Sequence, residues 1–192
     1  LRVLANHAAS DPCTFTVFMY SSVALRTPTL APGLTALDLI RQTLNRYLAG
    51  MKGYGIAGWT QYDKTTYLDA YPSLLIAARD YVHGSQDWKW LEKNYPKLQE
   101  WTNTMLETDH DGNGLLEYEL SGNANSWART ENPSMRPSNW WDTVGFGHED
   151  AYANALAYRA LLGMTELSLL NGELDEAEFY EKKATQIQSV YF

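Results

Sequence analysis

The C-terminal part of the chain pairs two helical patterns of different character, and this pairing limits the folds that the chain can adopt. Residues 148–170 carry alanine and leucine on nearly every side, as a helix that is buried all round does. After the Asn171-Gly172 turn, residues 173–192 form an amphipathic pattern in which charged residues separate the apolar ones. A buried inner helix joined to an amphipathic outer helix is the repeat unit of an α/α toroid, in which inner helices surround a central pocket. The sequence therefore predicts an all-α fold of helical hairpins that form part of a toroid.

Helical spacing of apolar residues continues upstream of this hairpin. It predicts further helices, and Pro96 is expected to separate two of them because proline interrupts the hydrogen bonds of a helix interior. The expected ranges are 34–51, 67–83, 87–94 and 96–108. A tight turn at residues 84–87 joins the second and third of these helices into another hairpin. No consensus recurs at a fixed period, so a helical-repeat solenoid is disfavoured.

The N-terminal part of the chain has a different pattern. Residues 1–33 lack a clear period and contain proline breaks, so we expect an irregular segment, with room for a short extended piece at residues 15–20. The helical-hairpin domain is expected to occupy residues 34–192. Because the chain starts at Leu1 and ends inside a helical pattern, we expect it to be a segment of a longer polypeptide, whose remainder is then a partner.

Charge and composition exclude several kinds of partner. The formal net charge is −8 and lysine and arginine form no cluster, which disfavours nucleic acid. No apolar run is long enough to cross a bilayer and no signal-peptide pattern opens the chain, so a soluble protein without a membrane partner is expected. The single cysteine, Cys13, cannot form an intrachain disulfide, which leaves a cytoplasmic or an exported location open.

A carboxylate beside two indoles is the strongest candidate for chemistry. It lies in residues 109–147, a predicted loop far longer than the usual connection, and such loops usually carry function. Trp140 and Trp141 precede Asp142, and a glycine-containing turn leads from there into a helix. Aromatic faces stack on sugar rings, and a carboxyl group among them is desolvated, which raises its pKa and lets it act as a general acid near neutral pH. Asp142 is therefore the predicted catalytic residue.

Several other residues are candidates for contact with a sugar. The expected stacking and rim residues are Trp59, Tyr62, Trp127, Trp140 and Trp141. Each has an ordinary alternative, because large aromatic side chains mostly fill cores. Asp69 stands where an inner helix is expected to begin, so it is expected either to bind sugar hydroxyls or to cap its own helix.

The loop also contains a run that is similar to the first part of a calcium loop. Asp109, Asp111 and Asn113 place hard oxygen ligands at alternate positions around glycines, so these three residues are candidate calcium ligands. The match to an EF-hand is incomplete, because Leu120 stands where the bidentate glutamate would be. The alternative is a glycine-rich turn held by Asx hydrogen bonds without an ion. No cofactor is otherwise required, and the four histidines lack metal-ligand spacing.

With these motifs in place, the chain resembles the six-hairpin glycosidases. These are (α/α)6-toroid glycoside hydrolases that include trehalases, glucosidase I and bile-acid-type β-glucosidases. The resemblance covers residues 65–192 and is carried by Asp69-Ala70-Tyr71-Pro72, by the hairpin at 79–87, and by Asp142 followed by Ala151-Tyr152 and Asn154-Ala155-Leu156. It implies part of an (α/α)6 toroid that cleaves a glucoside or a related oligosaccharide. In the β-glucosidase-like families an aspartate at the place of Asp142 is the general acid, and the resemblance gives Asp142 that role.

The chain departs from the trehalase and glucosidase I pattern at one position. There the acid lies in a Ser-Gly-x-Asp-x-Ser motif, whereas the run at residues 121–126 has Ala124 in place of the aspartate. Either the acid is Asp142 or the chain is an inactive relative, and the two tryptophans beside Asp142 favour the first. The second carboxylate that hydrolysis needs is expected beyond residue 192. Glu149 and Asp150 are expected to satisfy the dipole of the helix that they precede.

Two other classes of function stay open at this point. A noncatalytic carbohydrate-binding helical module would account for Ala124 and for the missing second carboxylate. A different toroid enzyme is the other class, either a phosphorylase with a site for inorganic phosphate or a polysaccharide lyase acting on uronic acids. The negative net charge disfavours an anionic polymer as substrate.

Overall fold

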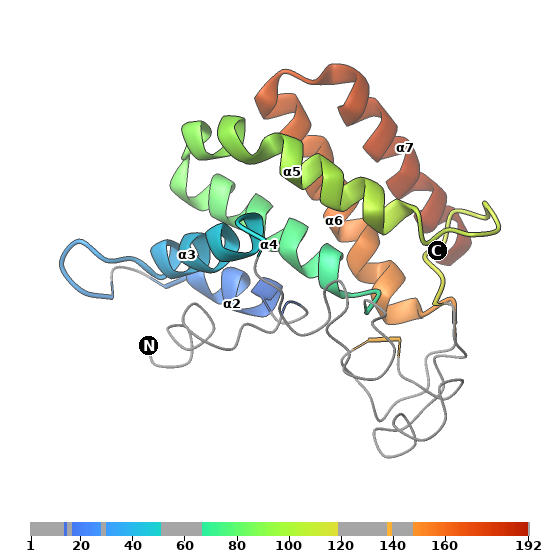
Figure 1. The fold of residues 1–192 in the computed structure, drawn as a ribbon, viewed down its shortest axis with the longest axis horizontal. Helices are drawn as coiled ribbons and strands as arrows, with labels where there is room; N and C mark the ends of the chain where they lie inside the picture. Colours follow the sequence, from blue (N-terminus) through green and yellow to red (C-terminus); the bar gives the residue numbers. More distant parts are fainter. Residues whose placement is uncertain are drawn as a thin grey trace, which may run out of the picture.

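The computed structural model describes residues 14, 17–27, 30–50, 67–118, 138–139 and 148–191. These residues contain six α-helices and no strand, which confirms the all-α prediction (Figure 1). The helices are α2 (Val17–Ala24), α3 (Ala36–Leu48), α4 (Ala70–Ser85), α5 (Trp88–Leu106), α6 (Ala151–Asn171) and α7 (Leu174–Tyr191). None of the helices in these ranges is long and apolar enough to cross a membrane.

The helices form three hairpins arranged in an inner and an outer row. In the inner row α4 packs against both α2 and α6, and each inner helix packs against the helix that follows it in the chain. The inner helix α4 is buried along nearly its whole length, whereas α7 buries a single stripe of four residues. That stripe consists of Ala177, Tyr180, Ala184 and Ile187. The amphipathic character predicted for residues 173–192 is therefore confirmed. Its partner α6 was expected to be buried all round, but that expectation is wrong, because Leu162, Leu169 and Leu170 are exposed.

Short turns join α4 to α5 and α6 to α7, so the two helices of each hairpin are antiparallel. Between α4 and α5 the chain reverses through Gln86, which adopts a left-handed conformation with φ of 55°, and Asp87, whose side chain accepts a hydrogen bond from the N–H of Trp90. Between α6 and α7 it reverses at Gly172, with φ of 85°. Glycine takes this conformation without the steric cost of a Cβ atom, which explains why α6 ends there.

Pro96 does not divide α5, so the prediction of two separate helices is wrong. The helix is continuous from Trp88 to Leu106. Proline removes the hydrogen bond to the carbonyl of Glu92, but both residues are exposed, so water can bind that carbonyl. The buried residues of α5 continue on both sides of the proline, from Leu91 to Leu98, and packing against the core holds the helix together.

Residues 17–24 form the helix α2, so the expectation of an irregular or extended segment there is wrong. Its buried residues are Val17, Ser21 and Ala24, which follow helical spacing. Two of these three are small, so the sequence shows no clear apolar period. Ser21 is nevertheless fully buried, because its hydroxyl has polar partners in the inner row.

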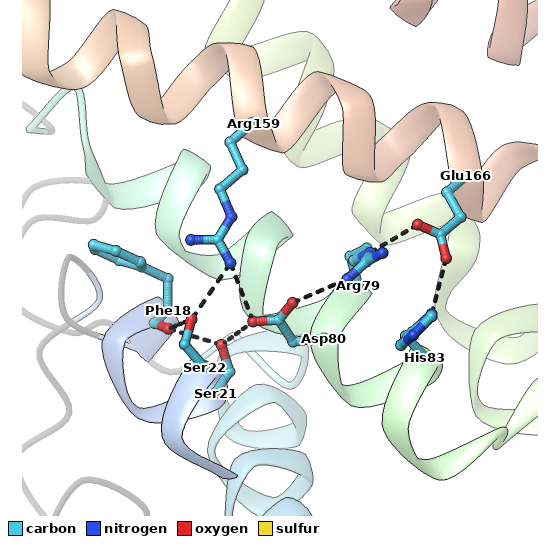
Figure 2. Close-up of polar contacts among 8 residues, drawn as sticks. All are labelled: Phe18, Ser21, Ser22, Arg79, Asp80, His83, Arg159 and Glu166. Atoms are coloured by element: carbon cyan, nitrogen blue, oxygen red, sulfur yellow. Dashed lines mark hydrogen bonds and ion pairs between the residues drawn. The ribbon is translucent and has the colours of Figure 1, made fainter. Parts of the chain in front are cut away.

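A buried carboxylate on α4 joins the three inner helices (Figure 2). Asp80 is 1% exposed, and its Oδ2 accepts a hydrogen bond of 2.8 Å from Ser21 Oγ on α2. The same oxygen lies 3.5 Å from Arg159 Nη2 on α6, and Arg159 also donates to Ser22 Oγ at 3.3 Å. A buried charge is tolerated when such partners replace the water that it has lost. Asp80 thus links α4 to its neighbours on both sides.

A hollow of about 250 Å³ opens beside this network, between α4 and α6. Arg79 at its wall donates a hydrogen bond of 2.7 Å from Nε to Glu166 Oε2, and Glu166 Oε1 lies 3.2 Å from His83 Nδ1 (Figure 2). A Cβ atom on Gly163 would lie 3.2 Å from Arg79 Cβ, so the glycine permits the close approach of the two helices. The charges in this hollow are paired with one another and connect α4 to α6.

Candidate active site

The inner helices α4 and α6 begin next to each other (Figure 1). Ser138 and Asn139 connect the two helix starts. The carbonyl of Ser138 accepts a hydrogen bond of 2.9 Å from the N–H of Leu68, just before α4, and both residues bind Asp150, just before α6. The segments that precede the inner helices therefore meet at one place.

Asp150 is the centre of this meeting point. It is fully buried and is the N-cap residue of α6, where its Oδ1 accepts a hydrogen bond of 2.9 Å from the N–H of Ala153. This confirms the predicted role at the helix start. Its Oδ2 accepts two further hydrogen bonds, from Ser138 Oγ and from Asn139 Nδ2. The sequence did not indicate this second set of contacts, because the partners lie 11 and 12 residues away.

Asn154 attaches the loop that follows α5 to the start of α6. Its Oδ1 accepts a hydrogen bond of 2.7 Å from the N–H of Leu116, and its Nδ2 donates to the carbonyl of Leu116 at 3.0 Å. Nearby, the N–H of Tyr118 donates to the carbonyl of His148 at 2.8 Å. Two sets of hydrogen bonds thus attach the loop beside Asp150, one through the side chain of Asn154 and one through the backbone of Tyr118. No role of its own was predicted for Asn154 from the sequence.

The run from Asp109 to Leu115 is folded by Asx hydrogen bonds, as its alternative reading expected. Asp109 Oδ2 accepts from the N–H of Gly114 at 3.1 Å, and Asp111 Oδ1 accepts from the N–H of Asn113 at 3.0 Å. Asn113 Oδ1 in turn accepts from the N–H of Leu115 at 2.8 Å. These bonds shape the turn from within the chain, and calcium binding by Asp109, Asp111 and Asn113 stays a prediction.

A group of acidic side chains lies beside this turn. Carboxylate oxygens of Asp111, Glu117 and Glu149 lie within 4.8 Å of one another, and Asn113 Nδ2 donates to Glu149 Oε1 at 3.1 Å. Burial and the nearby charge of Asp111 raise the pKa of Glu117, and the two histidines at positions 110 and 148 offset part of this rise. Of the predicted ligand set, Asp111 belongs to this group, whereas Glu117 and Glu149 were not foreseen as its neighbours.

Glu117→Gln is expected to raise the thermal midpoint of the protein at pH 7 in the presence of a chelator. The raised pKa means that the folded state binds the Glu117 proton more tightly than the unfolded chain does. The stability associated with this proton is complete below the unfolded pKa and is lost as pH rises through the folded pKa. We expect the gain to be present at pH 7 and to disappear toward pH 4, where Glu117 is protonated in the folded and the unfolded chain. Calorimetry from pH 4 to pH 8 measures it.

The matched control for this change is Glu178→Gln, which removes an exposed charge from α7. It is expected to leave the midpoint unchanged at every pH. With added calcium, binding at the loop would stabilise the wild type more than the Glu117 variant. A lower midpoint for Glu117→Gln at pH 7 without calcium would contradict the repulsion described here.

Asp69 is the one predicted sugar-binding residue among the described residues. It is fully buried at the N-cap position of α4, but its side chain makes no capping hydrogen bond. The capping alternative is therefore wrong, and contact with sugar hydroxyls stays a prediction. Its neighbour Leu68 is bonded to Ser138, so Asp69 lies beside the meeting point of the two helix starts. The other candidates lie outside the described residues: Trp59, Tyr62, Trp127, Trp140, Trp141 and the predicted acid Asp142.

Comparison with known families decides the relationship. Residues 57–192 match the bacterial alpha-L-rhamnosidase six-hairpin glycosidase domain. The chain belongs to this family. It is thus a glycoside hydrolase domain, and the matched residues contain the hairpins α4–α5 and α6–α7 of the six-hairpin fold. A comparison with curated proteins gave no match.

The family refines the resemblance noted in the sequence. The six-hairpin glycosidase fold and the glycosidase class are confirmed. The specific relatives named there, trehalase, glucosidase I and β-glucosidase, are replaced by the α-L-rhamnosidase family.

Proposed function

We propose that the protein hydrolyses α-L-rhamnosides and that Asp142 is the general acid. The family match over residues 57–192 supports the substrate class. The observation that supports this choice of acid is the hydrogen bonding of Ser138 and Asn139 to the segments that precede α4 and α6. Asp142 follows three residues after Asn139, so the acid belongs to the chain segment that leaves this junction.

The proposed reaction breaks the bond between the anomeric carbon of rhamnose and the glycosidic oxygen. Asp142 gives its proton to that oxygen as the bond breaks, so that the leaving group departs as a neutral alcohol. A second carboxylate either activates water or attacks the anomeric carbon from the other side of the sugar. We assign no residue of this chain to that second role.

The substrate-binding part of the proposal uses aromatic and acidic side chains. Rhamnose has a methyl group in place of a hydroxymethyl group, so one side of the sugar is less polar than glucose. Stacking by the candidate tryptophans and Tyr62 suits such a ring. Asp69, fully buried at the start of α4, is proposed to accept hydrogen bonds from rhamnose hydroxyls. The net charge of −8 is compatible with a neutral sugar and disfavours a uronic acid polymer.

The test of the proposed function is a panel of aryl glycosides assayed with the whole protein. Release of rhamnose from an aryl α-L-rhamnoside, at least about tenfold faster per enzyme than release of glucose from α- or β-glucosides, is the expected result, equivalent to about 1.4 kcal/mol of transition-state preference. Glucose release with no rhamnose release would overturn the substrate class. Phosphate-dependent formation of a sugar phosphate would identify a phosphorylase instead. Binding of rhamnose without turnover would identify a noncatalytic module.

A further inference from the structure

We propose that Asp150 is a positioning residue for catalysis, because one of its carboxylate oxygens holds the segment that leads to the acid. This proposal rests on the proposed function, in which Asp142 is the acid. Asp150 touches neither a reacting atom nor a substrate in this proposal. It acts through Ser138 and Asn139, which it fixes at the start of α6.

The two carboxylate oxygens of Asp150 bind different parts of the chain, which is the first argument for this role. An N-cap needs one acceptor, and Oδ1 fulfils this role with the N–H of Ala153 at 2.9 Å. Oδ2 is not needed for the helix, yet it accepts hydrogen bonds from Ser138 Oγ and Asn139 Nδ2. Half of the carboxylate is therefore used for a segment that is not part of α6.

Burial is the second argument. Asp150 is 0% exposed, and Ser138 and Asn139 are each 1% exposed. A carboxylate that has lost its water needs several donors in compensation. Among the described residues three donors bind Asp150, and two of them belong to the Ser138–Asn139 pair. A displaced pair would remove both donors from Oδ2, so the contact favours one position for the two residues.

Chain length is the third argument. Three residues of chain bring Asp142 to within about 11 Å of Asn139, measured between Cα atoms, because consecutive Cα atoms are about 3.8 Å apart. The carbonyl of Ser138 also accepts the N–H of Leu68, which adjoins Asp69 at the start of α4. Movement of the pair would therefore shift, relative to Asp69, the point from which the chain continues to Asp142. Displacements near 1 Å can cost about 100-fold in rate.

Asp87 provides a matched control within the same fold. It is the N-cap residue of α5, and its Oδ1 accepts the N–H of Trp90 at 3.1 Å. Its Oδ2 accepts a hydrogen bond of 2.6 Å from the hydroxyl of Tyr81. Like Asp150, Asp87 therefore caps a helix with one oxygen and accepts a side-chain hydrogen bond with the other. It lies at the opposite end of α4, and among the described residues its carboxylate oxygens accept from Trp90 and Tyr81 rather than from Ser138 or Asn139.

The test compares Asp150→Asn with Asp87→Asn in the whole protein, at a temperature where both variants are folded. Asparagine at position 150 can still accept the N–H of Ala153 with its Oδ1, which preserves the N-cap. Its NH2 group then replaces the oxygen that accepts from Ser138 and Asn139, so that acceptor is lost. Rhamnosides with poor leaving groups need the proton, and activated aryl rhamnosides need it much less. A separate measurement of kcat and KM for each kind of substrate distinguishes misplacement of the acid from a general loss of folded protein.

Asp150→Asn is expected to lower kcat about 10- to 100-fold on the poor leaving group, within the contribution of general acid catalysis, and at most about threefold on the activated one. KM is expected to change little. Asp87→Asn is expected to preserve the ratio of the two rates. An equal loss on both substrates, or no loss, would overturn the positioning role.

Two further variants complete the design. If Asp150→Asn does not fold, Ser138→Ala removes one donor and keeps the carboxylate, and the same selective loss is expected at a smaller size; a uniform loss overturns the proposal. Asp142→Asn tests the acid assignment separately from the positioning role of Asp150. A selective loss there with none in Asp150→Asn overturns the positioning role alone, whereas no selective loss in Asp142→Asn overturns the acid assignment together with it.

Discussion

Asp142→Asn is expected to lower kcat on α-L-rhamnosides with poor leaving groups by about 100- to 10,000-fold, the range that general acid catalysis contributes. Asparagine is nearly the same size as aspartate but has no acidic proton to give to the glycosidic oxygen. The leaving group must then depart as an anion, which is slow for an alkoxide and much easier for an activated phenolate. Steady-state kinetics on both kinds of rhamnoside measures the effect.

The change is expected to act on kcat far more than on KM, because the proton moves in the transition state and contributes little to binding of the substrate. Asp175→Asn, at an exposed position of α7, is the control for the loss of one negative charge and is expected to behave as the wild type. Wild-type turnover of poor substrates by the Asp142 variant would move the acid elsewhere in the protein.

Asn154→Ala is expected to destabilise the folded protein by about 3 kcal/mol. The side chain of Asn154 is the partner of both the N–H and the carbonyl of Leu116, and Leu116 is 1% exposed. Its Nδ2 also donates to the carbonyl of Asp150 at 3.1 Å. Truncation leaves the two backbone groups of Leu116 buried without that partner, and each such group costs about 1–3 kcal/mol. Unfolding by urea, followed by circular dichroism, measures the loss.

An exposed asparagine on α5 provides the control for this variant. Asn103→Ala removes the same atoms from a helix surface and is expected to change stability by at most about 0.5 kcal/mol. Asn154→Asp preserves the acceptor for the N–H of Leu116 and loses both donated bonds, so it is expected to be destabilising as well. A free energy of unfolding for Asn154→Ala within about 0.5 kcal/mol of the wild type would show that the loop does not depend on this contact.

The helices could be predicted where the buried residues are large and apolar. The hairpin of α6 and α7 follows from its periodicity and from Gly172, and α4 follows in the same way. Prediction from the sequence was wrong where tertiary packing outweighs a local preference. Pro96 breaks a hydrogen bond on the exposed side of α5, and the buried stripe of that helix overrides it. In α2 the buried position Ser21 reads as polar, and its partner Asp80 lies 59 residues away.

The candidate site shows the same limit. A local pattern identified Asp150 as the start of a helix, which is a contact within four residues. Its bonds to Ser138 and Asn139 depend on how a long loop returns to α6, and no period or motif specifies that return. The acidic group of Asp111, Glu117 and Glu149 likewise joins two segments that are distant in sequence. Residue types indicated the chemistry, whereas tertiary contacts determine which residues share a place.

The carboxylate of Asp80 contacts residues of two other hairpins, so the residue at each of these positions depends on the residues at the other two. Ser21 belongs to the first hairpin, Asp80 to the second and Arg159 to the third, and a replacement in any one leaves polar groups of another without their counterpart. A hairpin taken from a relative could therefore be grafted into this protein only if it brings the matching residue. We expect these three positions to be inherited as a set, so that recombination between members of the family succeeds at hairpin borders only when the whole set is kept.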